Sequence, residues 1–289
     1  MNESTILPPD TLSGICVGVS VSESEDLSRL GLLEGHFRSA FGEIARSVLV
    51  LGGQLAYGGH LDPHGYTAFL VSELKRYGRR DRPLRVCLAW SEHRRVPMGR
   101  LRSWILDLGL FGTLVCLDVD GRPINSWMDR GEEPLPVADS VQVERGLTEL
   151  RRHMCRATQG RVLIGGRRSG FRGAMPGLIE ETLLAIEAAQ PLYLAGGFGG
   201  VTLDIIRALH GDAALWFPPY EQATTVDTRS AVALGRLADL VADRGWKAIA
   251  NGLSDEENSL LAATHRPSQI AALVSLGLGR LAVQGRFAG

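Results

Sequence analysis

The chain has 289 residues, 45% hydrophobic and 22% charged, a composition that fits a globular protein able to bury a large core. The formal net charge is −1, so nucleic-acid binding would require a local basic patch, and we do not expect a nucleic-acid partner. No run of about 18 apolar residues could span a bilayer, and the N-terminal sequence lacks a basic leader and an apolar signal segment. We therefore expect a cytoplasmic protein with no membrane partner.

The four cysteines are far apart in the sequence and form no CxxC motif. Cys16, Cys87 and Cys116 lie inside apolar runs, whereas Cys155 follows a helical pattern. Thiols in such runs are typically buried and reduced. The spacing argues against a structural zinc site, and we expect neither a metal nor a cofactor.

The first half of the chain alternates between short apolar runs and amphipathic segments. Residues 1–12 are expected to form a flexible arm, and residues 119–138, rich in proline and polar side chains, a long loop. The patterns predict strands at 15–19, 55–57, 84–90 and 114–118, and helices at 34–51, 66–77 and 98–108.

Small polar residues and glycines follow the first two of these strands. Ser20 and Ser22 come after the first strand, and Gly58, Gly59 and His60 come after the second. Hydroxyl groups and glycine N–H groups at such positions can bind phosphate or sugar. The alternatives are that the serines cap a turn and that His60 is a solvated loop residue.

Residues 161–200 carry the strongest pattern in the chain. A strand at 161–164 leads into a basic, glycine-rich loop, a helix runs from about residue 177 to about residue 190, and a strand at 192–195 ends in another glycine cluster. Glycines let backbone N–H groups approach an anion, a helix N-terminus favours negative charge, and arginine donors match phosphate. We therefore predict a nucleotide-type phosphate site, the alternative being turn glycines and solvated arginines. The candidate ligand-binding residues of this stretch are Gly165, Gly166, Arg167, Arg168, Arg172, Met175, Pro176, Gly177, Gly196, Gly197, Gly199 and Gly200.

Neither glycine loop has the Gly-Lys-Ser/Thr sequence of a Walker motif, and neither has GxGxxG spacing before a helix. The pattern disfavours an ordinary Rossmann dehydrogenase. The remaining predicted elements are helices at 140–155, 202–209, 226–244, 254–263 and 267–283, and a short strand or packing segment at 214–217.

The alternation of strands and helices predicts an α/β fold, a Rossmann-like, doubly wound and mostly parallel sheet with C-terminal helices. Residues 13–289 are expected to form one domain, with a core at 13–210 and a helical part at 211–289. Ligands of such sheets bind at the carboxyl ends of strands, so the loops after residues 19, 57, 164 and 195 should meet in one crevice.

These motifs, from Ser20 to Gly200, resemble the SLOG superfamily, which joins Smf/DprA DNA-processing proteins to the Lonely Guy phosphoribohydrolases. The resemblance covers roughly residues 13–210 and is closest to SLOG domains of bacterial conflict systems. It implies a Rossmann-like fold, a nucleotide or nucleotide-derived ligand and a homo-oligomer.

Lonely Guy enzymes carry a PGGxGTxxE motif after a helix that bears Met and Arg. Here Met154 and Arg156 resemble the helix pair, and Glu180 and Glu181 fall at the acidic position. The resemblance implies that these acids and Arg156 would act in cleaving an N-glycosidic bond. The PGG and GT elements are replaced by GGRRSGFRGAMPG, which puts hydrolysis in doubt more than binding.

The residues and the resemblance together imply two alternative functions. The first is a sensor of an ADP-ribose-like or cyclic nucleotide signal, in bacterial defence. The alternative is a nucleotide or nucleoside N-glycosidase that uses Glu180 or Glu181, with Arg156 or Arg172 on the phosphate. A weaker third reading, binding of single-stranded DNA as in Smf proteins, is disfavoured by the near-neutral charge and by the lack of an aromatic and basic stripe.

Overall fold

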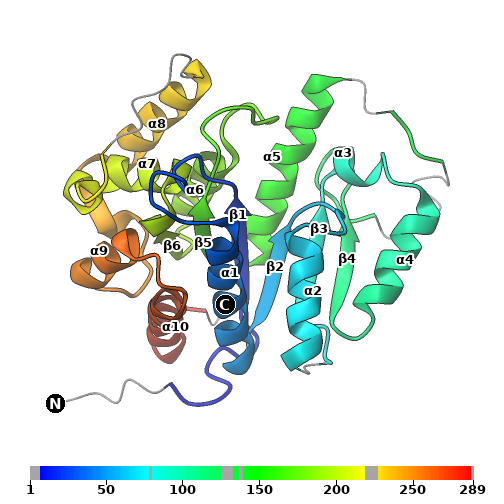
Figure 1. The fold of residues 1–289 in the computed structure, drawn as a ribbon, viewed down its shortest axis with the longest axis horizontal. Helices are drawn as coiled ribbons and strands as arrows, with labels where there is room; N and C mark the ends of the chain where they lie inside the picture. Colours follow the sequence, from blue (N-terminus) through cyan, green and yellow to red (C-terminus); the bar gives the residue numbers. More distant parts are fainter. Residues whose placement is uncertain (1–6, 78–79, 125–132, 137–138, 219–226, 288–289) are drawn as a thin grey trace.

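The computed structural model describes residues 7–77, 80–124, 133–136, 139–218 and 227–287. Its centre is a sheet of six parallel strands in the order β4-β3-β2-β1-β5-β6 (Figure 1). The order reverses between β1 and β5, so the connections leave this point in opposite directions and open a crevice at the carboxyl ends of the strands. The strands are β1 (Cys16–Ser22), β2 (Gln54–Gly58), β3 (Leu84–Leu88), β4 (Gly112–Cys116), β5 (Gly160–Gly165) and β6 (Leu192–Ala195).

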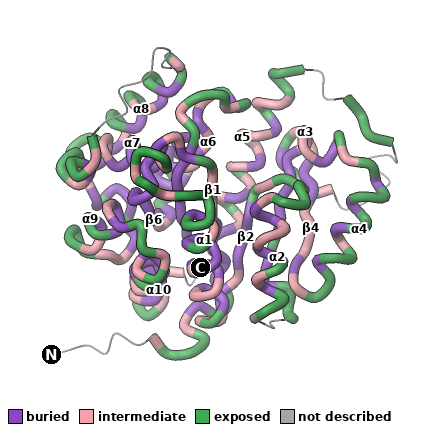
Figure 2. Tube along the Cα trace, in the orientation of Figure 1, coloured by how far each residue is buried: buried purple, intermediate pink, exposed green. Residues whose placement is uncertain are grey.

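Helices cover both faces of the sheet, as the predicted doubly wound α/β fold requires. Buried residues follow the strands and the inward faces of the helices, whereas exposed residues lie on the outside (Figure 2). One face packs against α1 (Glu34–Val50), α2 (Tyr66–Tyr77), α4 (Met98–Leu108) and α10 (Pro267–Val283). The other face packs against α5 (Ser140–Ala157), α6 (Gly177–Glu187) and α7 (Gly200–Leu209).

The core on the α1 face contains a group of aromatic side chains. The ring of Phe37 meets that of Phe198 edge-on, with centroids 5.1 Å apart. Phe41 contacts both Tyr57 and Tyr66. Such pairs add to the stabilisation from burial alone. Tyr57 is the last residue but one of β2 and Tyr66 begins α2, and both line the crevice, so this group also supports its edge.

The C-terminal helices extend the fold beyond β6. Helix α8 (Thr228–Val241) and the 3₁₀ helix η4 (Ala242–Ala248) join the apolar cluster of α6 and α7. Helix α9 (Asp255–Ala263) packs beside β6, and α10 packs along α1. No described helix is both long and apolar enough to cross a membrane.

Two elements differ from the sequence prediction near the crevice. Strand β1 continues to Ser22, because Ser20 and Ser22 pair in register with Leu163 and Gly165 of β5. The predicted strand at 84–90 ends at Leu88, and a short helix, α3 (Trp90–His93), begins where a strand was expected. The side chain of Arg94 stacks on the Trp90 ring, with Cζ 4.3 Å from the ring centroid, which stabilises this turn of helix.

Other differences lie away from the crevice. The predicted helix 226–244 is broken because Ala242 and Gly245 adopt positive φ, and residues 219–226 lie outside the described residues. Residues 211–214 form the 3₁₀ helix η3 (Gly211–Ala214), and no strand forms at 214–217. Much of the predicted loop 119–138 and residues 1–6 of the expected arm also lie outside the description, whereas Leu12 is fully buried.

Three of the four cysteines lie in strands, as the sequence predicted. Cys16, Cys87 and Cys116 are buried and none of the four forms a disulfide. Burial raises the pKa of the Cys16 thiol to about 11 and that of Cys87 to about 12. Both groups therefore stay protonated and act as small apolar side chains under α5.

Candidate functional site

A hollow lies at the carboxyl ends of β1, β2 and β5, between α5 and the N-terminus of α6. It consists of two adjoining cavities of about 400 Å³ and about 280 Å³, which we together call the crevice. These volumes are within the range of small-molecule sites. Both cavities are lined by Ser20, Ser22, Gly58, Gly59, His60, Arg151, Arg172 and Glu181.

Most predicted residues that reach the crevice come from the ends of strands and from the first turn of α6. Ser20 and Ser22 point to it because alternate residues of β1 share one face of the sheet. Gly58 and Gly59 leave the space above β2 open. The predicted residues that line the crevice are Ser20, Ser22, Gly58, Gly59, His60, Gly166, Arg167, Arg172, Gly177 and Glu181.

The floor of the crevice carries an ion pair. Glu181 Oε2 accepts a hydrogen bond from the Ser20 hydroxyl and lies 2.5 Å from Arg161 Nη1. Glu181 Oε1 faces Arg151 Nε at 3.9 Å. Because the three partners come from β1, β5 and α5, the acid joins the strand ends to the helix above them.

Glu180, the neighbouring acid, points elsewhere. Successive residues of a helix are rotated by about 100°, so adjacent acids cannot share a direction. Glu180 is buried between α5 and α6, where it pairs with Arg151 and accepts a hydrogen bond of 2.5 Å from the Thr148 hydroxyl. Glu180 does not line the crevice, and it holds α5 against α6.

Arg167 and Arg172 stand at the rim, about half exposed. Arg167 pairs with Glu23 and Arg172 pairs with Glu92 of α3. The Arg167–Glu23 pair is exposed on both sides, and exposed ion pairs contribute little to stability, whereas Glu92 is only 15% exposed and also pairs with Arg95. The rim therefore offers two cations that a ligand can recruit.

A comparison with protein-family models identifies the family of this chain. The family model described as SLOG cluster2 matches residues 11–261 of the chain. The chain belongs to this SLOG family. Membership indicates a nucleotide-related ligand that is bound or processed. Neither a curated protein nor a solved structure gives a significant match.

In this SLOG protein Arg168 does not line the crevice, and its side chain forms ion pairs that stabilise the fold. Its Nη2 lies 2.8 Å from Asp26 Oδ2, and its Nε lies 2.6 Å from Asp204 Oδ2. Burial alone would raise the pKa of Asp26, but hydrogen bonds from Arg168, Gly200 N–H and Arg29 outweigh it and lower that pKa. Asp26 is therefore a buried, ionised carboxylate.

The glycine cluster after β6 also serves packing. A Cβ on Gly196 would lie 2.4 Å from the Ala262 carbonyl oxygen, and one on Gly197 would lie 2.0 Å from that of Thr264. Gly199 adopts a φ of +69°, and Gly200 donates its N–H to Asp26 Oδ2 at 2.8 Å. Asp26 thus occupies the anion position at the N-terminus of α7. None of the four glycines lines the crevice.

Four further predicted site residues do not line the crevice: Gly165, Met175, Pro176 and Arg156. Gly165 has a φ of +70°, and a Cβ there would lie 2.4 Å from the Ser22 carbonyl oxygen and 2.5 Å from the Phe37 ring. Pro176 caps α6, and Met175 packs in the apolar cluster behind that helix. Arg156 is exposed in the last turn of α5, which lies at the opposite, amino edge of the sheet because β5 begins three residues after that helix ends.

Sequence reasoning missed two arginines of the crevice. Arg151 shares a helix face with Leu147 and Met154, a spacing of three and four residues that could have identified it. Arg161 is a charged residue in a strand that is otherwise apolar, which is a signal of a buried ion pair. Other apolar and aromatic lining residues were also missed, whereas Met154 had been noted; those missed are Val21, Tyr57, Tyr66, Leu147, Leu150, Phe171, Leu178 and Val201.

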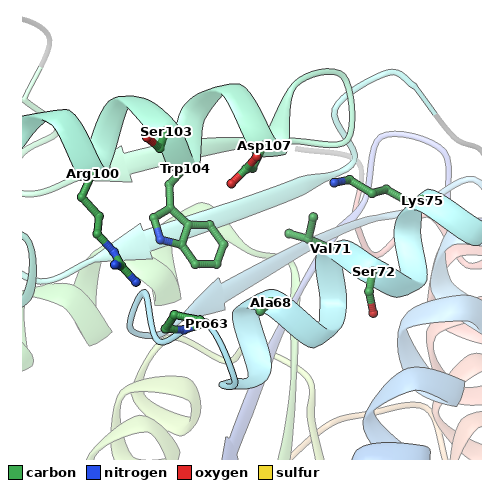
Figure 3. A pocket seen from close by; sticks show the side chains of 9 residues that line it. All are labelled: Pro63, Ala68, Val71, Ser72, Lys75, Arg100, Ser103, Trp104 and Asp107. Carbon is green, nitrogen blue, oxygen red and sulfur yellow. The ribbon is translucent and has the colours of Figure 1, made fainter.

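A second hollow, of about 480 Å³, lies between α2 and α4 (Figure 3). Trp104 and Val71 form its apolar part, and Lys75, Arg100 and Asp107 stand around it. None of the predicted site residues lines this hollow. In the part of the chain that the structure describes, no group of three or more His, Cys, Asp or Glu side chains could hold a metal ion.

Proposed function

We propose that the protein binds a nucleotide-derived signal, ADP-ribose-like or a cyclic nucleotide, in the crevice, and that it acts as a sensor in a bacterial defence system. The observation that carries this proposal is the meeting of the ends of β1, β2 and β5 with the N-terminus of α6 in one hollow. Arg151, Arg161, Arg167 and Arg172 all line that hollow. Membership of the SLOG family supports a nucleotide-related ligand. We also propose that the protein forms a homo-oligomer, on the basis of its resemblance to SLOG proteins.

A phosphate group fits best at the α6 end of the crevice. Gly177 begins α6 and lines the larger cavity together with Gly166 and Arg167. The first N–H groups of a helix and its dipole favour an anion, and the arginine adds a charge-assisted donor. Gly166 adopts a φ of +102°, and a Cβ there would lie 2.7 Å from a methyl of Leu178, so this approach needs glycine.

The sugar and base would then lie toward α5. Leu147, Leu150 and Met154 give this part of the crevice an apolar wall. Glu181 Oε1 can accept a hydrogen bond from a ribose hydroxyl, because only Oε2 is held by Ser20 and Arg161. Burial raises the pKa of Tyr66 to about 12, so its hydroxyl stays protonated and can donate.

A specific observation also supports the N-glycosidase as a second candidate. Glu181 is an acid in the crevice beside a cation, Arg151. If C1′ of a ribose lay against Glu181, the carboxylate would stabilise positive charge on the sugar while the N-glycosidic bond breaks. The base would leave with the bonding electron pair and take up a proton, and water would add its hydroxyl to C1′ and release a proton.

One experiment distinguishes the two candidates. The purified protein is incubated with AMP, NAD, ADP-ribose or cyclic di-AMP, and both the melting temperature and the release of free base are measured. A sensor should melt higher with at least one nucleotide, because a ligand that binds only the folded state stabilises it. The same nucleotide should be recovered intact by chromatography.

The enzyme predicts release of free base that Glu181→Gln abolishes. Glu187→Gln is the matched control, since this acid is exposed in the last turn of the same helix, lies outside the crevice and should leave any turnover in place. No melting shift and no base release with any of the four nucleotides would contradict both candidates.

A further inference from the structure

Arg161 is the largest fully buried side chain of the described chain, with 1% of it exposed. It belongs to β5 and projects from the sheet face that carries α5 and α6, where Leu163 is also found. Its guanidinium lies over Gly18 of β1, because a Cβ there would be 3.7 Å from Arg161 Cζ. Burying an arginine is unfavourable unless the charge is paired and hydrogen-bonded.

Two anchors fix the orientation of this guanidinium. On one side Nε donates to Gln190 Oε1 at 3.4 Å, and Gln190 is itself held because its Nε2 donates to the Thr158 carbonyl at 2.6 Å. On the other side Nη1 donates to Glu181 Oε2 at 2.5 Å and lies 3.4 Å from Ser20 Oγ. The chain of contacts therefore runs from the amino end of β5 to the floor of the crevice.

One nitrogen of Arg161 is left over. Among the described residues, Nη2 is buried and has no hydrogen-bond partner. A buried arginine that served packing alone would have its donors satisfied or would be replaced by an apolar side chain of similar volume. The charged partner of this guanidinium is Glu181, bound through Nη1, and this pair points to a role in placing Glu181.

We propose that Arg161 is a positioning residue of the ligand site. It holds Glu181 Oε2 against Ser20, so that the carboxylate keeps one orientation and presents Oε1 to the ligand. Arg161 thus acts on the ligand through Glu181. This inference rests on the proposed function, because it concerns a nucleotide bound in the crevice.

A double-mutant cycle tests the role. Affinities for AMP and ADP-ribose are measured by calorimetry for wild type, Arg161→Met, Glu181→Gln and the double variant, with Arg156→Met as an exposed control. In the wild-type background Arg161→Met should weaken binding by about tenfold, whereas in the Glu181→Gln background it should change binding by less than about twofold, since contacting residues are coupled. Arg156→Met should bind like wild type. Equal losses in both backgrounds would overturn the positioning role.

Failure of the proposed function gives a different result. If wild type binds neither probe, nor NAD nor cyclic di-AMP, the proposed function fails, and the melting temperatures of the four ligand-free proteins still measure the contact between Arg161 and Glu181. The double variant should then be less destabilised than the sum of the single variants, and strict additivity would contradict the locking of Glu181. If Arg161→Met does not fold, Arg161→Lys enters the same cycles. Lysine keeps the charge, but its single ammonium group cannot bind both Gln190 and Glu181 as the guanidinium does.

Discussion

Arg167 and Arg168 are neighbours in the chain, but their guanidinium groups lie in different surroundings. Arg167 is half exposed at the rim of the crevice and pairs with an exposed glutamate. Arg168 is largely buried and bridges Asp26 and Asp204. The pattern of glycines and arginines predicted a basic loop, and it could not tell the two roles apart because the partners, Asp26 and Asp204, are distant in sequence.

We therefore expect opposite results from replacing the two residues. Arg167→Ala should weaken nucleotide binding while changing the free energy of unfolding by less than about 0.5 kcal/mol, as for most exposed sites. Arg168→Ala should lower the free energy of unfolding by about 3 kcal/mol, because it leaves the buried Asp26 carboxylate and the partly buried Asp204 carboxylate without their shared cation. Urea unfolding of both variants checks this, and an Arg168→Ala protein as stable as wild type would contradict the assignment.

At the scale of elements, local pattern predicted most strands and helices, because the apolar periodicities of 2 and 3.6 residues are strong here. Helices α2 and α4 have the predicted bounds. The pattern was wrong at the end of β1, where pairing with β5 extends the strand, and at α3, where Trp90 was expected in a strand. It also gave the two glycine clusters the same meaning, although only the one before α6 reaches the crevice.

The cluster after β6 provides a test of this distinction. Gly197→Ala should lower the free energy of unfolding by about 1–3 kcal/mol, as overpacking typically does, because the added methyl would lie 2.0 Å from the Thr264 carbonyl oxygen. Gly235→Ala is the matched control: it lies within α8, no atom is within 4 Å of the added methyl, and helix propensity predicts a gain of up to about 1 kcal/mol. Equal melting temperatures for the two variants would contradict the packing role.

At the scale of the whole molecule, one buried carboxylate connects distant parts of the chain. Asp26 follows β1, Arg168 follows β5, and Gly200 begins α7, so Asp26 ties both sides of the strand-order reversal together. The alternation of elements predicted the sheet and the edge at which loops converge. It could not predict this tie, or the Arg161–Glu181 pair, because both depend on side chains that meet only after the sheet has formed.

The Asp26 contact makes stability depend on pH. The pKa of Asp26 is lowered in the folded protein, so the contact stabilises the fold above the ordinary carboxyl value near 3.8 and is lost as pH falls through the lower folded value. Asp26→Asn should destabilise the protein near pH 7 and flatten the fall in melting temperature below about pH 4. Melting curves from pH 7 to pH 2.5 check this, and parallel curves for both proteins would contradict it.

The carboxylate at the head of α7 also limits how a bound molecule can lie. Two helices start side by side along this sheet edge, and one of them already has a permanent negative group of the protein's own seated on its first N–H. A dinucleotide stretched along the edge, with a phosphate on each helix, would meet charge repulsion there. In the proposed complex a second phosphate would instead lie toward Arg167 and Arg172, whose side chains are about half exposed.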